Sequence, residues 1–275
     1  MLDQQNGVSG EEFQNLTRKI SRERGFGCAS YKEKCLRRRI AVRMRARGVH
    51  TYADYAHVLD TVADEYDRLL DALTINVTKL FRNWDAYAAI AKHVVPALWH
   101  RNTPSIRVWS AGCATGDEAY SIAILFHRYA STEGMLSQFG RLEVLGTDID
   151  RACLRAADQG VFEEADFEET PADLRERYFT PLAPFAVAPA IRECVRFERN
   201  DLLSDPAPPG PQDLIVCRNV LIYFDRAAQE RIFDAFHTAL APDGFLVLGK
   251  VETLLGPTRS RFIPVDARER IFRRA

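Results

Sequence analysis

The residues best suited to chemistry lie in one segment, Arg107–Ser121, which reads RVWSAGCATGDEAYS. These residue types predict a short buried strand, a glycine-rich turn and the start of a helix. Gly112 and Gly116 let the backbone bend sharply and approach a ligand closely, because neither has a Cβ atom. Asp117 and Glu118 open the helix where free N–H groups otherwise attract an anion. Such a turn suits a cationic or hydroxyl-rich ligand and points to S-adenosylmethionine rather than a dinucleotide.

The spacing of the two glycines supports the same choice. The segment has the form G-x-x-x-G, so the middle glycine of the dinucleotide fingerprint G-x-G-x-x-G is missing. This weakens the prediction of an oxidoreductase. A tight strand-to-helix turn that binds no ligand remains the alternative on spacing alone.

A second candidate site follows an apolar stretch, at Gly146–Asp150. A carboxylate at the end of a strand can accept hydrogen bonds from two ribose hydroxyls. The alternative is that Asp148 or Asp150 only caps the next helix. We expect Asp150 to cap this helix and Asp148 to bind ribose.

Two further segments, Val195–Leu202 and Asp213–Phe224, place polar residues around the end of a predicted strand. Arg218 and Asn219 could hold the adenine or the amino-acid end of a cofactor. Tyr223 could face the reacting centre, and a core aromatic residue with a satisfied hydroxyl is an equally good interpretation.

Arg82 lies at the boundary between two differently patterned parts of the chain, in the segment Asn76–Arg82. A guanidinium group can bind a carboxylate through two parallel hydrogen bonds. The alternative role is an ordinary ion pair between domains, which residue type alone would favour.

A basic stretch lies between Arg18 and Arg47, with twelve Lys and Arg residues against two acids. Its predicted helix buries Leu36, Ile40 and Met44 along one stripe. The arginines of this helix are Arg37, Arg38, Arg39, Arg43, Arg45 and Arg47. A solvated face is the usual explanation of a charge run, but an excess of ten positive charges also makes an acidic partner plausible. No aromatic-interleaved basic motif supports nucleic acid as that partner.

The elements that must position these residues fall into two classes. From about Glu11 to Leu73 apolar residues recur at helical spacing without proline, which predicts a small helical bundle. After that, strands are predicted at Ile106–Ser110, Leu142–Gly146, Asp213–Cys217 and Gly244–Gly249, and helices at Glu118–Tyr129, Arg151–Ala157 and Ala227–Leu240. This alternation predicts an open, mainly parallel sheet with helices on both faces, whose ligands bind beyond the carboxyl ends of the strands. A proline-containing stretch, Tyr178–Phe197, reads as an irregular or hairpin insertion.

Composition limits the remaining functional classes. The chain has 275 residues, a formal net charge of -1 and six cysteines without C-x-x-C spacing. The cysteines and histidines therefore predict no metal site. The polar N-terminus and the lack of a long apolar run predict a cytoplasmic protein without membrane insertion.

Several of these motifs, in this order, resemble the chemotaxis receptor methyltransferases of the CheR type. The resemblance runs from about Phe13 to the C-terminus. It rests on Tyr31-Lys32 with the arginine-rich helix, Asn76-x-Thr78-x-x-Phe81-Arg82, Trp109–Glu118, Thr147–Asp150 and Cys217–Asp225.

The resemblance implies an α/β protein with a Rossmann-like class I methyltransferase domain that carries a small inserted β-subdomain, after an all-α domain. We expect the helical domain at 1–75, the methyltransferase domain at 76–275 and the insertion at about 178–197. The implied activity is methyl transfer from S-adenosylmethionine to glutamate side chains of chemoreceptors, which leaves S-adenosylhomocysteine. A methyltransferase with another acceptor and a non-catalytic cofactor-sensing or scaffold module are the alternatives.

The resemblance also assigns residues. It implies cofactor contacts by Asn76, Thr78, Arg82, Glu118, Asp148, Arg218 and Asn219, to which we add Gly112, Asn200, Asp201 and Leu202. It implies catalytic roles for Arg82 and Tyr223. The basic helix, with Arg38, Arg39, Arg43 and Arg45, is expected to face the acidic helical bundle of the receptor.

The chain departs from the family pattern at four places: Leu80, Asp117-Glu118-Ala119, Asp201 and Gly249–Glu252. These departures leave room for altered activity. The insertion is also short and lacks the glycine-rich loop of relatives that bind a receptor's C-terminal peptide. We therefore expect no pentapeptide tether.

Overall fold

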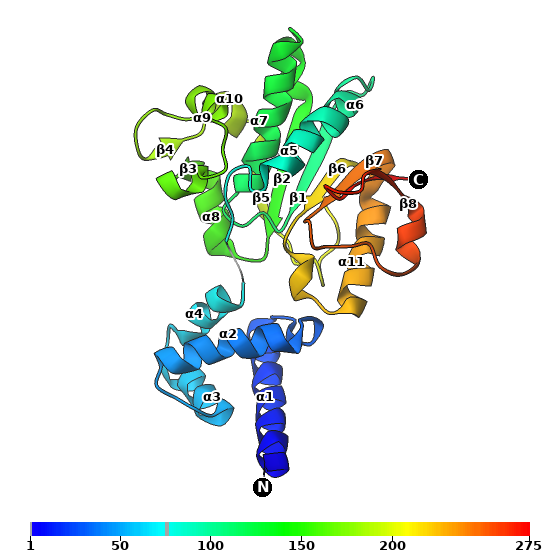
Figure 1. The fold of residues 1–275 in the computed structure, drawn as a ribbon. Coiled ribbons are helices and arrows are strands. Elements are labelled where there is room, and N and C mark those ends of the chain that lie inside the picture. The colour runs from blue at the N-terminus through cyan, green and yellow to red at the C-terminus, as the bar shows by residue number, and fades with distance from the viewer. Residues whose placement is uncertain (1, 75–76) are drawn as a thin grey trace. The chain divides into compact units, whose positions relative to one another are not determined.

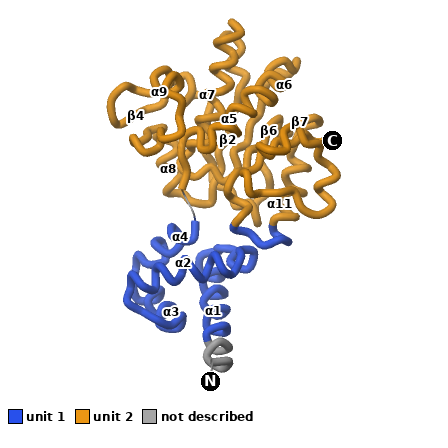
Figure 2. Tube along the Cα trace, in the orientation of Figure 1, with its two compact units in different colours: residues 1–75, 223–228 blue, residues 76–222, 229–275 orange. Residues whose placement is uncertain are grey.

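The computed structural model describes the backbone of residues 2–74 and 77–275, and side chains from Ser9 onward. The chain divides into two compact units (Figure 2). Unit 1 comprises Met1–Ile75 and Tyr223–Ala228, and unit 2 comprises Asn76–Ile222 and Gln229–Ala275. Within the described residues, no helix combines the length and the apolarity needed to cross a bilayer.

Among its described residues, unit 1 contains the helices α1 (Leu2–Arg24), α2 (Glu33–Ala46), α3 (Tyr52–Thr61) and α4 (Glu65–Leu73). The predicted stripe of α2 is confirmed, since Leu36, Ile40 and Met44 are all buried. Gly48 ends the turn after α2 with a φ of +68°, a conformation that favours glycine. The helical bundle expected from the apolar spacing is therefore present.

A short segment from far along the sequence, Tyr223–Ala228, also belongs to unit 1. The backbone N–H of Lys32 donates to the carbonyl of Tyr223 at 2.9 Å, and the N–H of Asp225 donates to the carbonyl of Ser30 at 2.9 Å. The rings of Tyr31 and Phe224 meet edge to face, with centroids 4.8 Å apart. The sequence did not predict this arrangement, because nothing local to the segment marks it as part of the helical unit.

Unit 2 contains a seven-stranded sheet with the order β5-β2-β1-β6-β7-β9-β8 (Figure 1). Its strands are β1 (Ile106–Ala111), β2 (Leu142–Asp148), β5 (Val195–Arg199), β6 (Gln212–Cys217), β7 (Leu240–Leu248), β8 (Phe262–Asp266) and β9 (Ile271–Arg274). The first five strands in this order are parallel, and β9 and β8 are antiparallel additions. The four predicted strands are confirmed, whereas β5, β8 and β9 were not predicted as strands.

Helices cover both faces of this sheet. The α-helices that follow unit 1 along the chain are α5 (Trp84–Ala89), α6 (Val95–Trp99), α7 (Asp117–Thr132), α8 (Arg151–Gln159), α9 (Ala172–Tyr178), α10 (Pro189–Arg192) and α11 (Arg226–Ala239), of which α11 begins in unit 1. Val108 belongs to the hydrophobic core that includes α7, while the neighbouring Trp109 packs edge to face on Phe236 of α11. Because successive side chains of a strand point to opposite faces, α7 and α11 lie on opposite sides of the sheet.

The insertion differs from the range predicted for it. Its two-stranded sheet pairs β3 (Val161–Phe162) with β4 (Phe185–Ala186), so it begins well before residue 178. The end of the predicted range, Val195–Phe197, belongs instead to β5 (Val195–Arg199), an edge strand parallel to β2. Val195 and Phe197 pack against the core between charged neighbours, which is the alternation of a half-buried strand. The prolines before this strand obscured its short pattern.

Candidate functional site

The glycine-rich turn joins β1 to α7 as predicted. Gly112 and Gly116 have φ values of +79° and +88°, which favour glycine. A Cβ atom on Gly112 would lie 2.6 Å from Cγ2 of Val220, and one on Gly116 would lie 2.8 Å from Cζ of Phe197. Packing within the protein therefore already requires both glycines. A ligand contact by Gly112 stays a prediction.

Two buried acids open α7. Glu118 accepts a hydrogen bond from Oγ of Ser110 at 2.9 Å, and burial raises its pKa to about 7 against the opposing charge of Arg218. Asp117 accepts from the hydroxyl of Thr115 at 2.6 Å through Oδ2. Burial raises the pKa of Asp117 to about 6. The charged form of each carboxylate is therefore less stable in this buried position than it would be at the protein surface.

The two carboxylates after β2, Asp148 and Asp150, have different roles in the structure, and the predicted cap by Asp150 is confirmed. Oδ1 of Asp150 accepts from the backbone N–H groups of Ala152 and Cys153, which makes it the N-cap of α8. Asp148 accepts from the N–H of Ala114 at 2.9 Å and from the N–H of Asp150 at 3.0 Å, and burial raises its pKa. A carboxylate has about four lone-pair positions, so Asp148 retains capacity for a hydroxyl donor.

The loop after β5 joins the same edge of the sheet. The N–H of Asn200 donates to the carbonyl of Asp148 at 3.1 Å, and its Nδ2 donates to the carbonyl of Pro206 at 2.9 Å. Asp201 is buried and accepts from the N–H of Leu203 at 2.9 Å, and Leu202 is half-buried. The structure therefore brings Asn200, which sequence reasoning proposed, next to Asp148.

The turn after β6 carries Arg218 and Asn219. Arg218 is buried, and its Nη2 donates to the carbonyl of Arg82 at 3.0 Å. Asn219 has a φ of +62°. Its N–H donates to the carboxylate of Glu252 at 3.0 Å. The sequence marks Glu252 only as part of a variant motif, and its signal is a carboxylate four residues beyond the end of a buried strand.

The loop that carries Thr78 and Arg82 has an unusual backbone. Phe81 and Asn83 have φ values of +54° and +59°, although neither is glycine. The N–H of Phe81 donates to Oγ of Ser121 at 2.9 Å, and Nη1 of Arg82 donates to the carbonyl of Val77 at 2.7 Å. Residues other than glycine adopt a positive φ only where surrounding contacts stabilise that conformation, and such residues are common at functional sites. Thr78 and Arg82 are half-buried, and the predicted Asn76 lies outside the described residues.

These loops leave unused hydrogen-bonding capacity. Oδ1 of Asp117, Oδ1 of Asn200 and Nε of Arg218 are buried and have no hydrogen-bond partner within the described part of the chain. Two acceptors and one cationic donor at the carboxyl edge of a parallel sheet match a ligand that carries hydroxyl, ammonium and carboxylate groups. The residues present therefore fit S-adenosylmethionine.

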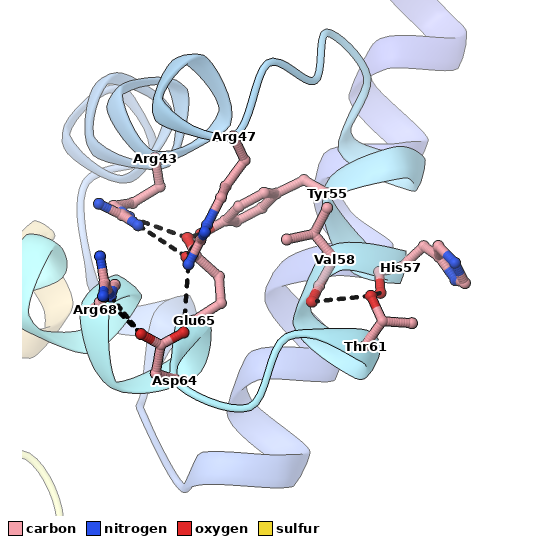
Figure 3. Close-up of polar contacts among 9 residues, drawn as sticks. All are labelled: Arg43, Arg47, Tyr55, His57, Val58, Thr61, Asp64, Glu65 and Arg68. Carbon is pink, nitrogen blue, oxygen red and sulfur yellow. Dashed lines mark hydrogen bonds and ion pairs between the residues drawn. The ribbon is translucent and has the colours of Figure 1, made fainter.

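The basic helix α2 is only partly available to a partner. Arg43 contacts the carboxylate of Glu65 through Nε at 3.0 Å and Nη2 at 2.8 Å, and Arg47 adds a bond at 2.6 Å (Figure 3). Tyr55 donates to the same carboxylate at 2.7 Å. Although burial alone would raise the pKa of Glu65, the bonds from Arg43, Tyr55 and Arg47 lower it to about 2.

This pairing gives Arg43 a structural role within unit 1, and a contact between Arg43 and substrate stays a prediction. The side chain of Glu65 is fully buried and that of Arg43 is 16% exposed, so the pair belongs to the interior of unit 1. The excess of positive charge counted along the sequence is also smaller than it appeared, because Glu65 and Asp64 lie outside the counted stretch yet pair with its arginines. Arg38 and Arg45 are exposed.

Arg39 and the predicted catalytic Tyr223 lie together in unit 1. The guanidinium carbon of Arg39 is 5.7 Å from the centroid of the Tyr223 ring, and its Nη1 donates to the carbonyl of Ala72 at 2.6 Å. Burial lowers the pKa of Arg39 against the opposing influence of Tyr223. Tyr223 is half-buried, so it is not a fully enclosed core aromatic residue.

The mostly parallel sheet, the glycine-rich turn after β1 and the preceding all-α bundle define a class I methyltransferase that uses S-adenosylmethionine as its cofactor. The CheR methyltransferase SAM-binding domain matches residues 76–271, and the CheR methyltransferase all-alpha domain matches residues 11–74. The chain belongs to the CheR methyltransferase family.

Two relatives that are similar in sequence over most of their length agree with this assignment. A chemotaxis protein methyltransferase of Listeria monocytogenes is 33% identical over 248 residues, which cover 90% of this chain and 92% of the relative. The chemotaxis protein methyltransferase of Escherichia coli is 31% identical over 253 residues, with coverages of 89% and 85%. A TehB-like SAM-dependent methyltransferase from Corynebacterium glutamicum has a TM-score of 0.37 and 17% identity over 70% of this chain and 92% of its own.

Proposed function

We propose that this methyltransferase modifies glutamate side chains on the cytoplasmic helical bundle of chemoreceptors and forms glutamate methyl esters. The observation that carries the proposal is the site at the carboxyl edge of the sheet, in a chain whose relatives are named chemotaxis protein methyltransferases. An exposed basic helix face adds to it, because acidic helical bundles attract such a face.

The reaction requires little acid–base chemistry from the protein. S-adenosylmethionine supplies an electrophilic methyl group when bound. A glutamate side chain with a pKa of about 4.3 is already ionised at neutral pH, so no general base is needed. Alignment of the two reactants can supply as much as roughly 7–11 kcal/mol of the acceleration.

Arg82 is the residue to which we assign this alignment. Its guanidinium group would orient the carboxylate of the substrate, and it would also lie near the cofactor. Arg218 supports this role, because it holds the backbone carbonyl of Arg82. Tyr223 is the second residue to which we assign a catalytic role, and Arg39 beside it is an assigned substrate contact.

The cofactor contacts divide by chemistry. Asp148 and Glu118 are carboxylates that would accept hydrogen bonds from the hydroxyl and ammonium groups of the ligand. Asn200, Asp201 and Leu202 follow β5 beside Asp148, where a nucleoside would extend. Arg218, Asn219, Thr78 and Asn76 would hold the amino-acid end.

The test is methyl transfer from radiolabelled S-adenosylmethionine to purified chemoreceptor cytoplasmic fragments. Label that is released by mild alkali and maps to glutamate is expected. Alkali-stable label, or label on another class of acceptor, would favour a methyltransferase with a different substrate. Cofactor binding without any transfer would favour a sensing or scaffold role.

The insertion bears on how the receptor is held. It contains only two-residue strands, β3 and β4, between short helices. We infer that this chain does not bind the C-terminal pentapeptide of a receptor. Tight binding of such a peptide in calorimetry would contradict this inference.

A further inference from the structure

The carboxylate of Glu252 lies between two loops of unit 2 and is buried. Its Oε1 accepts from the backbone N–H groups of Val220 at 2.9 Å and Leu221 at 2.8 Å. Its Oε2 accepts from those of Asn219 at 3.0 Å and Gly249 at 2.6 Å. One side chain thus satisfies four backbone donors, two of them in buried and two in partly buried hydrogen bonds.

The loops that Glu252 joins approach each other unusually closely. Asn219 has a left-handed φ of +62°. A Cβ atom on Gly249 would lie 2.9 Å from the backbone nitrogen of Asn219 and 2.8 Å from Oε2 of Glu252. Close approach of the two loops at the carboxylate therefore requires glycine at position 249.

The same turn connects to the loop of Arg82. Arg218 immediately precedes Asn219, and its Nη2 donates to the carbonyl of Arg82 at 3.0 Å and contacts Oδ1 of Asn83 at 3.4 Å. A shift of the turn after β6 would therefore move both Arg218 and the support of Arg82.

We propose that Glu252 is a positioning residue of the cofactor site, which fixes Asn219 directly and Arg82 through Arg218. This role rests on the proposed function, because the cofactor contacts of Arg218 and Asn219 are part of it. Glu252 itself touches neither cofactor nor substrate in this proposal.

The decisive variant is Glu252→Gln. Each carboxylate oxygen accepts two N–H groups, so either orientation of the amide turns its NH2 group toward two donors. We expect the affinity for S-adenosylhomocysteine, measured by calorimetry, to fall about tenfold or more. Glu252→Asp keeps the charge but withdraws the acceptor by one methylene, and its affinity should fall between those of the wild type and Glu252→Gln.

Asp213→Asn is the matched control. Asp213 is a buried carboxylate at the opposite end of β6, where it accepts from the N–H of Arg107 at 2.9 Å and contacts Arg101 at 3.3 Å. The chemical change is the same, but it lies away from the turn after β6. Its affinity for S-adenosylhomocysteine should stay at the wild-type value even where its melting temperature falls.

The outcomes separate the two proposals. Thermal melting first establishes that the control and both Glu252 variants are folded. If all three then bind S-adenosylhomocysteine with the wild-type affinity, the positioning role is overturned and Glu252 is a purely structural residue. A wild-type chain that does not bind S-adenosylhomocysteine would overturn both proposals. A wild-type chain that binds it but labels no glutamate overturns only the proposed substrate, and the Glu252 comparison still decides the positioning role.

Discussion

Buried carboxylates are treated in opposite ways in the two units. In unit 1, Glu65 receives hydrogen bonds from Arg43, Arg47 and Tyr55, and its pKa falls to about 2. In unit 2, burial raises the pKa of Glu118 to about 7 and that of Asp117 to about 6. The first arrangement is complete within the protein, whereas the second leaves charge and hydrogen-bonding capacity that a ligand can use.

The sign of the pH dependence differs accordingly. Folding lowers the pKa of Glu65 from an ordinary value of 4.5, so its stabilising contribution is lost as the pH falls from about 4.5 toward about 2. Folding raises the pKa of Glu118, so the stability of the free unit 2 decreases as the pH rises from about 4.5 to about 7. The Glu65 cluster therefore stabilises unit 1, whereas burial of Glu118 reduces the stability of unit 2 in the absence of a ligand.

The largest expected effect is on unit 1. Glu65→Ala would leave two guanidinium groups and a tyrosine hydroxyl without their shared acceptor, and should lower the free energy of unfolding by about 3 kcal/mol. Urea denaturation would measure the loss. Unchanged stability would contradict the view that this cluster is structural.

Arg82→Ala should produce the next largest effect. A misaligned carboxylate should lower turnover about 100-fold, while the affinity for S-adenosylhomocysteine changes far less. Steady-state kinetics and calorimetry on the same preparation would separate the two quantities. Equal losses in turnover and affinity would mean that Arg82 acts through cofactor binding instead.

The affinity for S-adenosylhomocysteine should depend on the protonation of Glu118. Hydroxyl and ammonium groups donate to the ionised carboxylate, so the affinity should fall by up to about tenfold as the pH drops from 7 to 6. Glu118→Gln should bind more weakly at pH 8 but lose most of this slope. If Glu118→Gln kept the full dependence of affinity on pH, the titrating group would be Asp117 or Asp148 instead.

The smallest effect is expected at the exposed arginines of α2. Replacing Arg38 and Arg45 together by Ala should reduce methylation of a receptor fragment a few-fold and weaken its dependence on salt. The free energy of unfolding should change by no more than about 0.5 kcal/mol, because both side chains are on the surface. Methylation assays at two ionic strengths provide the measurement.

Much of the fold was predictable because its central elements are long and strongly patterned. The strands at Gln212–Cys217 and Leu240–Leu248 contain the continuous apolar runs Leu214–Cys217 and Phe245–Leu248, as parallel strands buried on both faces should. Val195–Arg199 and Ile271–Arg274 were missed because they are short and lie at or near the sheet edge, where few residues carry the pattern.

The site was predictable only where one motif carries its own chemistry. The capping role of Asp150 and the position of Asp148 followed from their place after an apolar strand. The pairing of Arg43 with Glu65 joins residues 22 positions apart, and Glu252 reaches a turn more than 30 positions away. Local sequence shows neither partner, so the charge of α2 was overcounted and Glu252 was passed over.

The discontinuity of unit 1 has a consequence for biosynthesis. Helices α1 to α4 leave the ribosome well before the stretch Tyr223–Ala228, whose bonds to Ser30 and Lys32 complete their assembly. Domains usually fold as they emerge, with the first one finished early. Here the last contacts of the helical bundle can form only after the stretch Tyr223–Ala228 has been translated, which follows the main strands and helices of unit 2 up to β6.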